Sequence, residues 1–334
     1  MGGDFGPAAA VAGAAMASLD AEGVHVVLTG PAEVIQRELD LHPHDPRRLS
    51  LLDAGPPVPM DADPRAALER CPEASIAVAT RLLREGGADG LVSAGHTGAT
   101  VLSAASQLER IAGVHRAALA AVVPTEAPHG PRRDPFSLML DVGATLHVTG
   151  RELVEFAIMG AAYSSIISGI REPSVALLSN GTEPGKGPAE VVEAHRVLSG
   201  VPVRFVGNVE GLDIPRGTAD VFVCEGYVGN VVLKMLEGVA DVFRELAVDA
   251  AARHLKWKLG LSMLEGGMRR LHRVADWEHY GGSPLLGFEQ VIIKAHGRSG
   301  PVAIRNAIKV SAKAVEGGLA RRIAAGIESL EEAR

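Results

Sequence analysis

Glycine, asparagine and glutamate gather in two turns of the segment 203–238, and each turn follows an apolar run. The runs 203–206 and 219–224 are typical of buried strands, and a helical pattern begins after the second turn. Turns at the carboxyl ends of parallel strands are where α/β proteins place ligands, because glycine allows close approach and helix N-termini offer free N–H groups. The residues of these turns that we expect to bind substrate or act in catalysis are Asn208, Glu210, Gly211, Glu225, Gly229 and Asn230.

A third glycine-rich turn, residues 180–187, follows the apolar run 175–178 and contains Asn180, Gly185, Lys186 and Gly187. A lysine between glycines suits a phosphate group, since its charge stands beside free N–H groups. The turn is not a nucleotide-binding P-loop, because the first required glycine is an asparagine and the final Ser/Thr is a glycine. We predict an anion site at Lys186; the alternative is a solvated loop lysine.

A fourth junction, residues 93–99, carries His96, Thr97 and Gly98 ahead of a helical pattern. A loop histidine more often caps a helix or lies on the surface than acts in catalysis, although it can also donate a hydrogen bond to an anion. We therefore include His96, Thr97 and Gly98 among the candidate substrate-binding residues.

Several common chemistries have no motif in this sequence. The chain contains no G-x-S-x-G nucleophile elbow, no G-x-G-x-x-G fingerprint after a strand and no H-E-x-x-H or paired-cysteine metal motif. We expect no metal and no cofactor. The net charge of −7 argues against nucleic-acid binding, which requires a basic surface.

Apolar runs alternate with helical patterns along the whole chain. The runs 24–28, 90–92, 119–123, 138–140, 175–178, 203–206, 221–224 and 291–294 predict strands. The patterns 76–85, 99–110, 152–168, 190–198, 231–252 and 305–329 predict helices, and 42–64 predicts a surface loop. This alternation predicts a doubly wound, mainly parallel α/β/α sandwich, which we assign to one domain, 1–334.

A basic amphipathic segment stands out in this acidic protein, within a helical hairpin that we expect to protrude at residues 240–280. The residues that we expect to contact a membrane or an acidic protein are Arg253, Lys256, Trp257, Lys258, Leu261, Leu264, Arg269 and Arg270. Cations interleaved with apolar side chains are typical of elements that bind anionic membranes or acidic partners. A solvated hairpin packed in a dimer interface is the alternative. The apolar run 117–123 is too short to span a bilayer and the N-terminus shows no signal-peptide pattern, so we expect a cytoplasmic protein with peripheral membrane contact.

These motifs closely resemble those of the phosphate acyltransferases called PlsX. The resemblance extends from the Met1-Gly2-Gly3-Asp4 turn, through the segments 93–99, 140–144, 185–187 and 205–238, to 280–287 and 295–297. It implies a Rossmann-like fold similar to those of isopropylmalate dehydrogenase and phosphotransacetylase. It also implies further substrate-binding residues, which are Asp4, Asp141, Tyr280, Gly281, Gly282 and His296. This chain has His96 and Thr145 where the family usually has asparagine, and it starts at the turn that a short strand usually precedes.

By resemblance, the reaction is acyl-ACP plus inorganic phosphate giving acyl phosphate and ACP. We expect Lys186 to hold phosphate, Asn208 and Asn230 to donate to the thioester oxygen, and Asp4, Glu210 and Glu225 to orient these groups. The resemblance also implies a homodimer, and a downstream partner in phospholipid synthesis, a membrane glycerol-3-phosphate acyltransferase. Two alternatives are a soluble phosphate acetyl- or butyryltransferase that uses acyl-CoA, and a catalytically impaired, membrane-associated scaffold of lipid synthesis.

Overall fold

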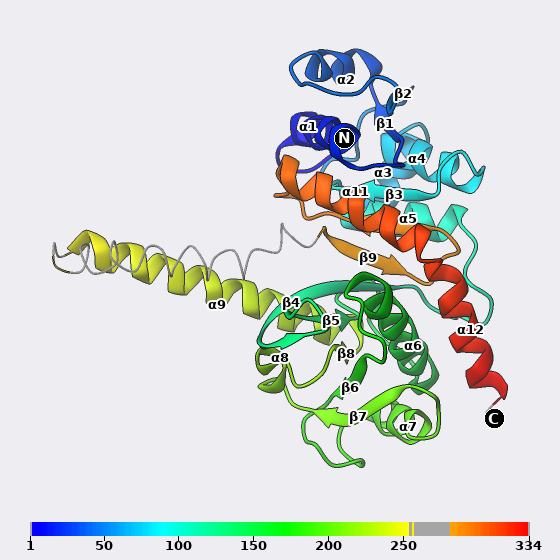
Figure 1. Ribbon diagram of the computed structural model, residues 1–334, viewed down its shortest axis with the longest axis vertical. Helices are drawn as coiled ribbons and strands as arrows, with labels where there is room; N and C mark the ends of the chain where they lie inside the picture. The colour runs from blue at the N-terminus through cyan, green and yellow to red at the C-terminus, as the bar shows by residue number, and fades with distance from the viewer. Residues whose placement is uncertain (1, 254–255, 257–280, 333–334) are drawn as a thin grey trace.

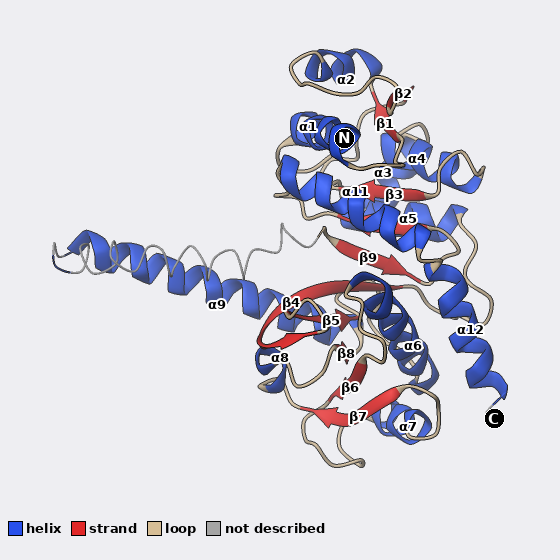
Figure 2. Ribbon diagram, viewed as in Figure 1, coloured by secondary structure: helices blue, strands red, loops and turns tan. Residues whose placement is uncertain are grey.

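A central sheet with helices on both faces makes up the protein (Figures 1 and 2). The computed structural model describes residues 2–253, 256 and 281–332. The described strands are β1 (Val26–Gly30), β2 (Leu49–Asp53), β3 (Gly90–Ser93), β4 (Ala118–His129), β5 (Asp134–Leu140), β6 (Ser174–Leu178), β7 (Arg204–Val209), β8 (Val221–Val223), β9 (Ser283–Leu286) and β10 (Val291–Lys294).

Eight strands form one sheet in the order β3-β10-β9-β4-β5-β8-β6-β7, and β1 pairs with β2 separately. The pairs β10/β3, β5/β8, β6/β8, β6/β7 and β1/β2 are parallel, whereas β9 pairs antiparallel with β10 and β4, and β4 with β5. The predicted mainly parallel sheet is confirmed. Two strands were not predicted: β9, which contains a proline, and β2, which falls within the segment 42–64 that we expected to be a loop.

The helices are α1 (Gly6–Asp20), α2 (Ala32–Leu39), α3 (Pro64–Arg70), α4 (Ser75–Arg84), α5 (Thr97–Gln107), α6 (Gly150–Ile167), α7 (Ala189–Leu198), α8 (Asp213–Arg216), α9 (Gly226–Arg253), α11 (Pro301–Glu316) and α12 (Leu319–Glu332). The single helix expected at 305–329 is two helices. The break lies at Gly317 and Gly318, and Gly318 has a φ of +63°, which a continuing helix does not allow.

Alternate residues of the central strands enter two different hydrophobic cores. Leu138 and Leu140 of β5 pack in the core that α1, α6, α7, α11 and α12 cover, while Met139 between them packs in the core under α4, α5, α8 and α9. The same alternation occurs in β6, where Ala176 enters the second core. Helices therefore bury both faces of the sheet, and the predicted α/β/α sandwich is confirmed.

The chain has two lobes along the sheet (Figure 1). We call the part with β1–β3, β10, α1–α5 and α11 the first lobe, and the part with β5–β8 and α6–α8 the second lobe. Strands β9 and β4 connect them within the eight-stranded sheet.

Helix α9 begins at the second lobe and projects away from the body of the molecule (Figure 1). Its outer part carries large exposed side chains, among them Val242, Phe243 and Leu246. The hairpin that we expected at 240–280 lies mostly outside the described residues, which include α9 and the exposed Lys256.

A hollow separates β1 from β3, although helices cover both sides. Helix α4 contacts both strands, α1 contacts β1, and α11 contacts β3. The hollow is lined by Thr29 of β1, by Leu91 and Ser93 of β3, and by Gly2 at one end. The edges of β1 and β3 that face each other have no strand partner in the described sheets.

Candidate functional site

Four parallel strands of the second lobe, β5, β8, β6 and β7, end at the same edge of the sheet. The turn after β5 contains Asp141, the loop after β6 contains Lys186, and β7 carries Asn208 near its end. Strand β8 leads into Glu225 and the first turn of α9. The structure therefore brings most of the predicted second-lobe residues to one edge, where α/β proteins place their ligands.

Asp141 lies beneath this edge and holds the turn after β5 in place through hydrogen bonds. Its side chain is fully buried, and its two carboxylate oxygens accept N–H bonds of 2.8–3.1 Å from Leu119, Gly143, Ala144 and Thr145. Burial raises the pKa of Asp141, and the hydrogen bonds oppose this change. With both oxygens surrounded by backbone donors, Asp141 shapes the turn and presents no oxygen to a ligand.

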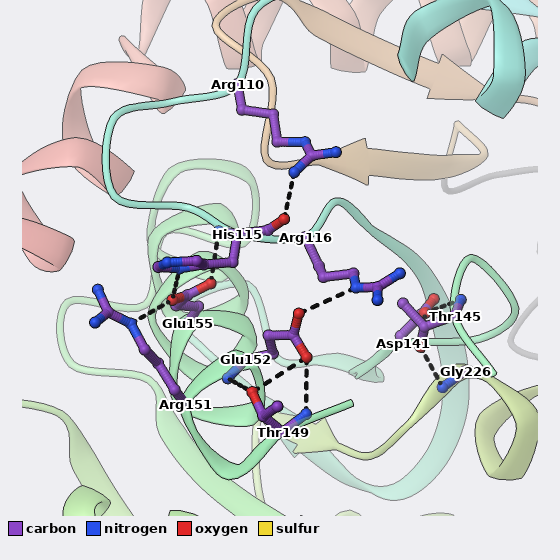
Figure 3. A network of polar contacts seen from close by, with 10 residues as sticks. All are labelled: Arg110, His115, Arg116, Asp141, Thr145, Thr149, Arg151, Glu152, Glu155 and Gly226. Atoms are coloured by element: carbon purple, nitrogen blue, oxygen red, sulfur yellow. Dashed lines mark hydrogen bonds and ion pairs between the residues drawn. The ribbon is translucent and has the colours of Figure 1, made fainter. Parts of the chain in front are cut away.

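Thr145 links this turn to α9. Its hydroxyl donates to Asp141 Oδ2 over 2.9 Å and accepts the N–H of Gly226 over 3.0 Å (Figure 3). A Cβ at Gly229 would lie 1.8 Å from the carbonyl oxygen of Asp141, so only glycine lets the helix come this close. Gly229, which we expected at the substrate, thus packs against the turn.

Asn230 extends over the same turn from the first turn of α9. The residue is exposed, and its Nδ2 donates to the carbonyl oxygen of Val142 over 3.1 Å. Nδ2 also lies 3.0 Å from the position of a Cβ at Gly143. Glu225, directly before the helix, is half-buried. Asn230 is therefore a predicted donor that stands at the open side of the edge.

Lys186 is exposed on the loop after β6. Its N–H donates to the carbonyl oxygen of Glu183 over 3.0 Å, and its aliphatic stem lies over Gly181, where a Cβ would meet Lys186 Cγ at 2.8 Å. Gly187 has a φ of +101°, which favours glycine. Oε2 of Glu183 lies over the same Gly181, 2.9 Å from that Cβ position, but no ion pair joins a carboxylate to the Lys186 ammonium among the described residues. Asn180 and Gly185, also predicted at the site, are exposed on the same loop.

Asn208 supports this loop from below. It is 5% exposed, and its Nδ2 donates to the carbonyl oxygen of Glu183 over 2.9 Å. Its Oδ1 accepts from Nδ1 of His195 on α7, also over 2.9 Å, and the His195 ring packs edge-on against Phe205. Both ends of the amide are thus engaged within the protein. Sequence reasoning missed His195, because nothing distinguishes it there from any helical histidine.

The turn after β7 carries the remaining predicted residues of this lobe. The N–H of Glu210 donates to Oδ2 of Asp213 over 3.0 Å, which begins the short helix α8, and the Glu210 side chain is half-buried. Gly211 is exposed.

The first lobe holds a second group of predicted residues. The N–H of Asp4 donates to the carbonyl oxygen of Gly297 over 2.8 Å, so the N-terminal turn lies on the loop that contains His296. Nδ1 of His96 accepts the N–H of Ala99 over 3.3 Å and caps α5. Thr97 and Gly98 form the first turn of α5, and Gly281 and Gly282 precede β9.

His296 brings the first-lobe group into relation with α9. Burial lowers the pKa of this half-buried histidine, and Glu237 of α9 opposes the change. The cations that add to the lowering are Lys234 of α9, Lys294 and Arg298. Because Lys234 and Glu237 follow Asn230 by one and two turns of helix, the first-lobe group lies within electrostatic reach of the start of α9.

The linker from α5 to β4 is fastened to α6 by ion pairs (Figure 3). Arg116 Nε donates to Glu152 over 3.0 Å, and His115 donates through its N–H (2.9 Å) and through Nδ1 (2.7 Å) to the fully buried Glu155. Burial raises the pKa of Glu152, but the bonds from Thr149 and Arg116 outweigh it and lower the pKa overall. These contacts fix where one lobe continues into the other.

Other predicted residues lie outside the described part of the chain. They are Trp257, Lys258, Leu261, Leu264, Arg269, Arg270, Tyr280 and the side chain of Arg253. Within the described residues no group of three His, Cys, Asp or Glu side chains could hold a metal ion, and no helix is long and apolar enough to cross a membrane.

Comparison with known proteins shows to which family this chain is similar. The family model "Fatty acid synthesis protein" matches residues 1–322. A phosphate acyltransferase of Desulfitobacterium hafniense (strain Y51) is 41% identical over 324 residues, covering 97% of this chain and 94% of the relative. A phosphate acyltransferase of Nitratidesulfovibrio vulgaris (strain DP4) is 38% identical over 333 residues, covering 99% and 94%.

Solved structures share the fold. A phosphotransacetylase from Streptococcus pyogenes matches with a TM-score of 0.60 at 19% identity, covering 93% of each chain. The EutD phosphotransacetylase from Staphylococcus aureus matches with a TM-score of 0.54 at 17% identity, covering 90% of this chain and 89% of the other. At these identities the likeness concerns architecture alone, and it agrees with the predicted fold class.

Proposed function

The chain belongs to the phosphate acyltransferase family known as PlsX. We propose that it transfers a fatty acyl group from acyl-ACP to inorganic phosphate. The acyl phosphate would then serve phospholipid synthesis. The observation that supports this reaction most directly is the pair of exposed groups on neighbouring loops, Lys186 after β6 and Asn230 after β8. No carboxylate in the described part of the chain forms an ion pair with the lysine.

The reaction requires no side-chain nucleophile. Phosphate is an oxyanion at neutral pH and attacks the thioester carbon itself, so the protein has to hold it close and in line. Lys186 and the N–H groups of its loop are suited to this task. The new C–O bond forms, negative charge develops on the carbonyl oxygen, and the C–S bond then breaks with its electron pair on sulfur.

Asn230 is the better of the two asparagines for the developing oxyanion. Its amide stands at the open edge, whereas both ends of the Asn208 amide are bonded within the fold. Preorganised amide donors of this kind stabilise a tetrahedral oxyanion by several kcal/mol. We assign Asn208 to the support of the Lys186 loop.

The choice of ACP as donor, and of a membrane as location, is supported by the end of α9 and the segment that follows it. ACP is an acidic protein, and the basic residues of 253–270 include the exposed Lys256. A peripheral position on an anionic membrane would place the product near its consumer, a membrane glycerol-3-phosphate acyltransferase.

A homodimer through α9 forms part of this proposal. Val242 is 54% and Leu246 59% exposed, one turn apart on a helix that leaves the body, and apolar side chains in this setting favour a partner. Val242→Glu with Leu246→Glu is expected to halve the mass measured by light scattering. Glu245→Gln on the same helix serves as the control and should leave the mass unchanged.

One assay tests the reaction. The protein is incubated with phosphate and either palmitoyl-ACP, palmitoyl-CoA or acetyl-CoA, and the acyl phosphate is trapped with hydroxylamine. We expect product from palmitoyl-ACP and little from acetyl-CoA. Equal or faster turnover of acetyl-CoA would instead favour a soluble phosphate acetyltransferase. A folded protein that turns over none of the three would favour the scaffold.

A further inference from the structure

Lys294 is a buried cation that the proposed chemistry has not used. It is 5% exposed, and of the lysines and arginines in the described residues it alone is buried. It is the last residue of β10, where it pairs with Ser93 of β3 and Ser283 of β9. The side chain therefore stands at the carboxyl end of a first-lobe strand, the same kind of position that Asp141 occupies in the second lobe.

The ammonium of Lys294 has few partners. Nζ donates to the carbonyl oxygen of Ala295, and no carboxylate within the described residues forms an ion pair with it. Burial lowers the pKa of Lys294 to about 8, against the opposing charge of Asp4. A buried cation with one acceptor for three N–H donors costs stability, so such groups are typical of functional sites.

Turns that flank the predicted substrate residues surround this lysine. The N-terminal turn approaches both neighbouring loops, because a Cβ at Gly3 would lie 3.1 Å from the carbonyl oxygens of Ala94 and Gly297. A Cβ at Gly282 would lie 2.8 Å from the carbonyl oxygen of Lys294 itself. Lys294 thus sits where three glycine-rich turns meet.

Charges of Lys294 and of α9 act on the same residue, His296. Lys294 acts on His296, and so do Lys234 and Glu237 of α9. With a rise of about 1.5 Å per residue, Lys234 and Glu237 lie about 6 Å and about 10 Å along the helix from Asn230. His296, two residues after Lys294, therefore lies within range of charges on the early turns of α9, the helix that carries Asn230.

From this position we propose that Lys294 is a catalytic residue that donates its proton to the thiolate leaving the acyl group. The inference rests on the proposed function. Phosphate attacks as HPO₄²⁻, the C–O bond forms, and the C–S bond breaks with its electrons on sulfur. Nζ gives one proton to that sulfur, and the proton that phosphate loses on becoming an acyl phosphate returns to Nζ through solvent.

In the proposed reaction Lys186 serves the phosphate and Asn230 the carbonyl oxygen, and sulfur is the reacting atom that has no assigned side chain. The departing thiolate is stabilised by a positive group that can give it a proton. A general acid works best when its pKa lies near the operating pH, and burial moves the pKa of Lys294 toward that range. Burial strengthens the interaction, because charges attract more in a low-dielectric site.

Thioesters with different leaving groups provide the test. An alkyl thiol such as pantetheine needs a proton to leave, whereas thiophenol leaves readily as an anion. Lys294→Met is expected to lower kcat with palmitoyl-pantetheine by about 100-fold and to change kcat with S-phenyl thiopalmitate less than about threefold. Lys294→Arg keeps the charge but gives up no proton, so it should show the same selective loss. Lys309→Met, a surface change on α11, is the control.

The outcomes separate this inference from the proposed function. Equal losses on both thioesters, or a raised KM for phosphate with unchanged kcat, would overturn the proton-donor role. Full activity of Lys294→Arg with the alkyl thioester would also overturn it, since charge alone would then suffice. Wild-type protein that makes no acyl phosphate from either thioester would overturn the proposed function and this role with it.

A pH profile gives a second readout. The wild-type kcat with palmitoyl-pantetheine is expected to fall above about pH 8 as the ammonium loses its proton. In Lys294→Arg this fall should disappear. The charged groups near Lys294 and His296 are Asp4, Arg298, Lys234 and Glu237. A fall that persists in Lys294→Arg belongs to another group and contradicts the proposal.

Discussion

Nδ2 of Asn208 donates a 2.9 Å hydrogen bond to the carbonyl oxygen of Glu183, so a strand end holds the loop that carries Lys186. Oδ1 of the same amide accepts from His195, so both polar atoms of the buried Asn208 side chain make hydrogen bonds within the protein. This relationship separates two asparagines that are equivalent in sequence. Asn208 supports the loop of Lys186, while Asn230 is exposed and is our proposed donor to the substrate.

Asn208→Ala is therefore expected to loosen the loop of Lys186 and weaken the binding of phosphate. Losing both bonds inside the fold is expected to cost about 1–3 kcal/mol of unfolding free energy and to raise the KM for phosphate. Asn230→Ala, the matched variant, should instead lower kcat by about 10²–10³ with little change in Tm. Steady-state kinetics and thermal unfolding measure both effects. If Asn208→Ala lowers only kcat and leaves Tm unchanged, Asn208 stabilises the oxyanion and does not support the loop.

Lys186→Ala is expected to raise the KM for phosphate or lower turnover by at least about tenfold, because a charge-assisted contact contributes about 1.5–3 kcal/mol. Its Tm should stay within about 1 °C, since exposed substitutions of this kind change stability little. Lys186→Arg should retain part of the activity. Lys309→Ala on α11 is the control. If Lys186→Ala has the same kcat and KM as wild type, Lys186 does not bind phosphate.

Thr145 should matter through its hydroxyl. Thr145→Val keeps the shape but removes the bond to Asp141 Oδ2 and leaves the N–H of Gly226 without its acceptor. We expect a loss of about 1–3 kcal/mol and a Tm lower by about 2–6 °C. Thr145→Ser, which keeps the hydroxyl, should lie close to wild type. Equal Tm values for the two variants would mean that the hydrogen bonds contribute nothing.

Most of the fold could be predicted from the apolar runs. Runs such as 175–178 and 291–294 predict buried strands in an α/β chain, and both are strands at nearly the predicted bounds. Strand β9 escaped prediction because Gly281, Gly282 and Pro284 are typical of a turn. Helix α1 escaped because its small apolar residues show no polar face: Gly13 packs directly against Ile304 of α11.

The sequence indicated where the candidate residues lie along the chain, but it did not indicate which of them are buried. Sequence places Asp141, Asn208 and Asn230 after strands, and the structure brings them to one edge. Burial then decides what each side chain can do, and burial depends on neighbours distant in sequence. Asp141 is surrounded by N–H groups that include that of Leu119, from another strand, and Lys294 gave no signal because it ends an ordinary apolar run.

Acid is expected to lower the free energy of unfolding by protonating Asp220, which precedes β8. Burial raises the pKa of this carboxyl, but bonds from His129 (2.7 Å) and Ser174 (2.6 Å) outweigh it and lower the pKa overall. A lowered folded-state pKa means that the contribution is fully present above the ordinary value of 3.8 and is lost as the pH falls through the folded value.

The measurement for Asp220 is unfolding free energy against pH. Asp220→Asn is expected to be less stable than wild type at pH 7 by about 1–3 kcal/mol, and the difference should shrink below pH 3.8. Asp89→Asn, at an exposed position, is the control. A gap between wild type and Asp220→Asn that stays constant down to pH 2 would contradict the assignment.

The hollow between β1 and β3 offers a test of the sheet itself. Both strands present an unpaired edge to it, α4 spans both, and Gly2 lies at the end where β3 terminates, with a Cβ there 2.7 Å from Gly95 Cα. An extended segment attached before Met1 would run parallel to β3 and could pair with both edges. Five alternating β-branched residues fused there are expected to raise Tm, because they satisfy backbone groups and bury apolar surface. A fused Gly/Ser segment of equal length is the control, and equal Tm values for the two fusions would mean that the hollow does not accept a strand.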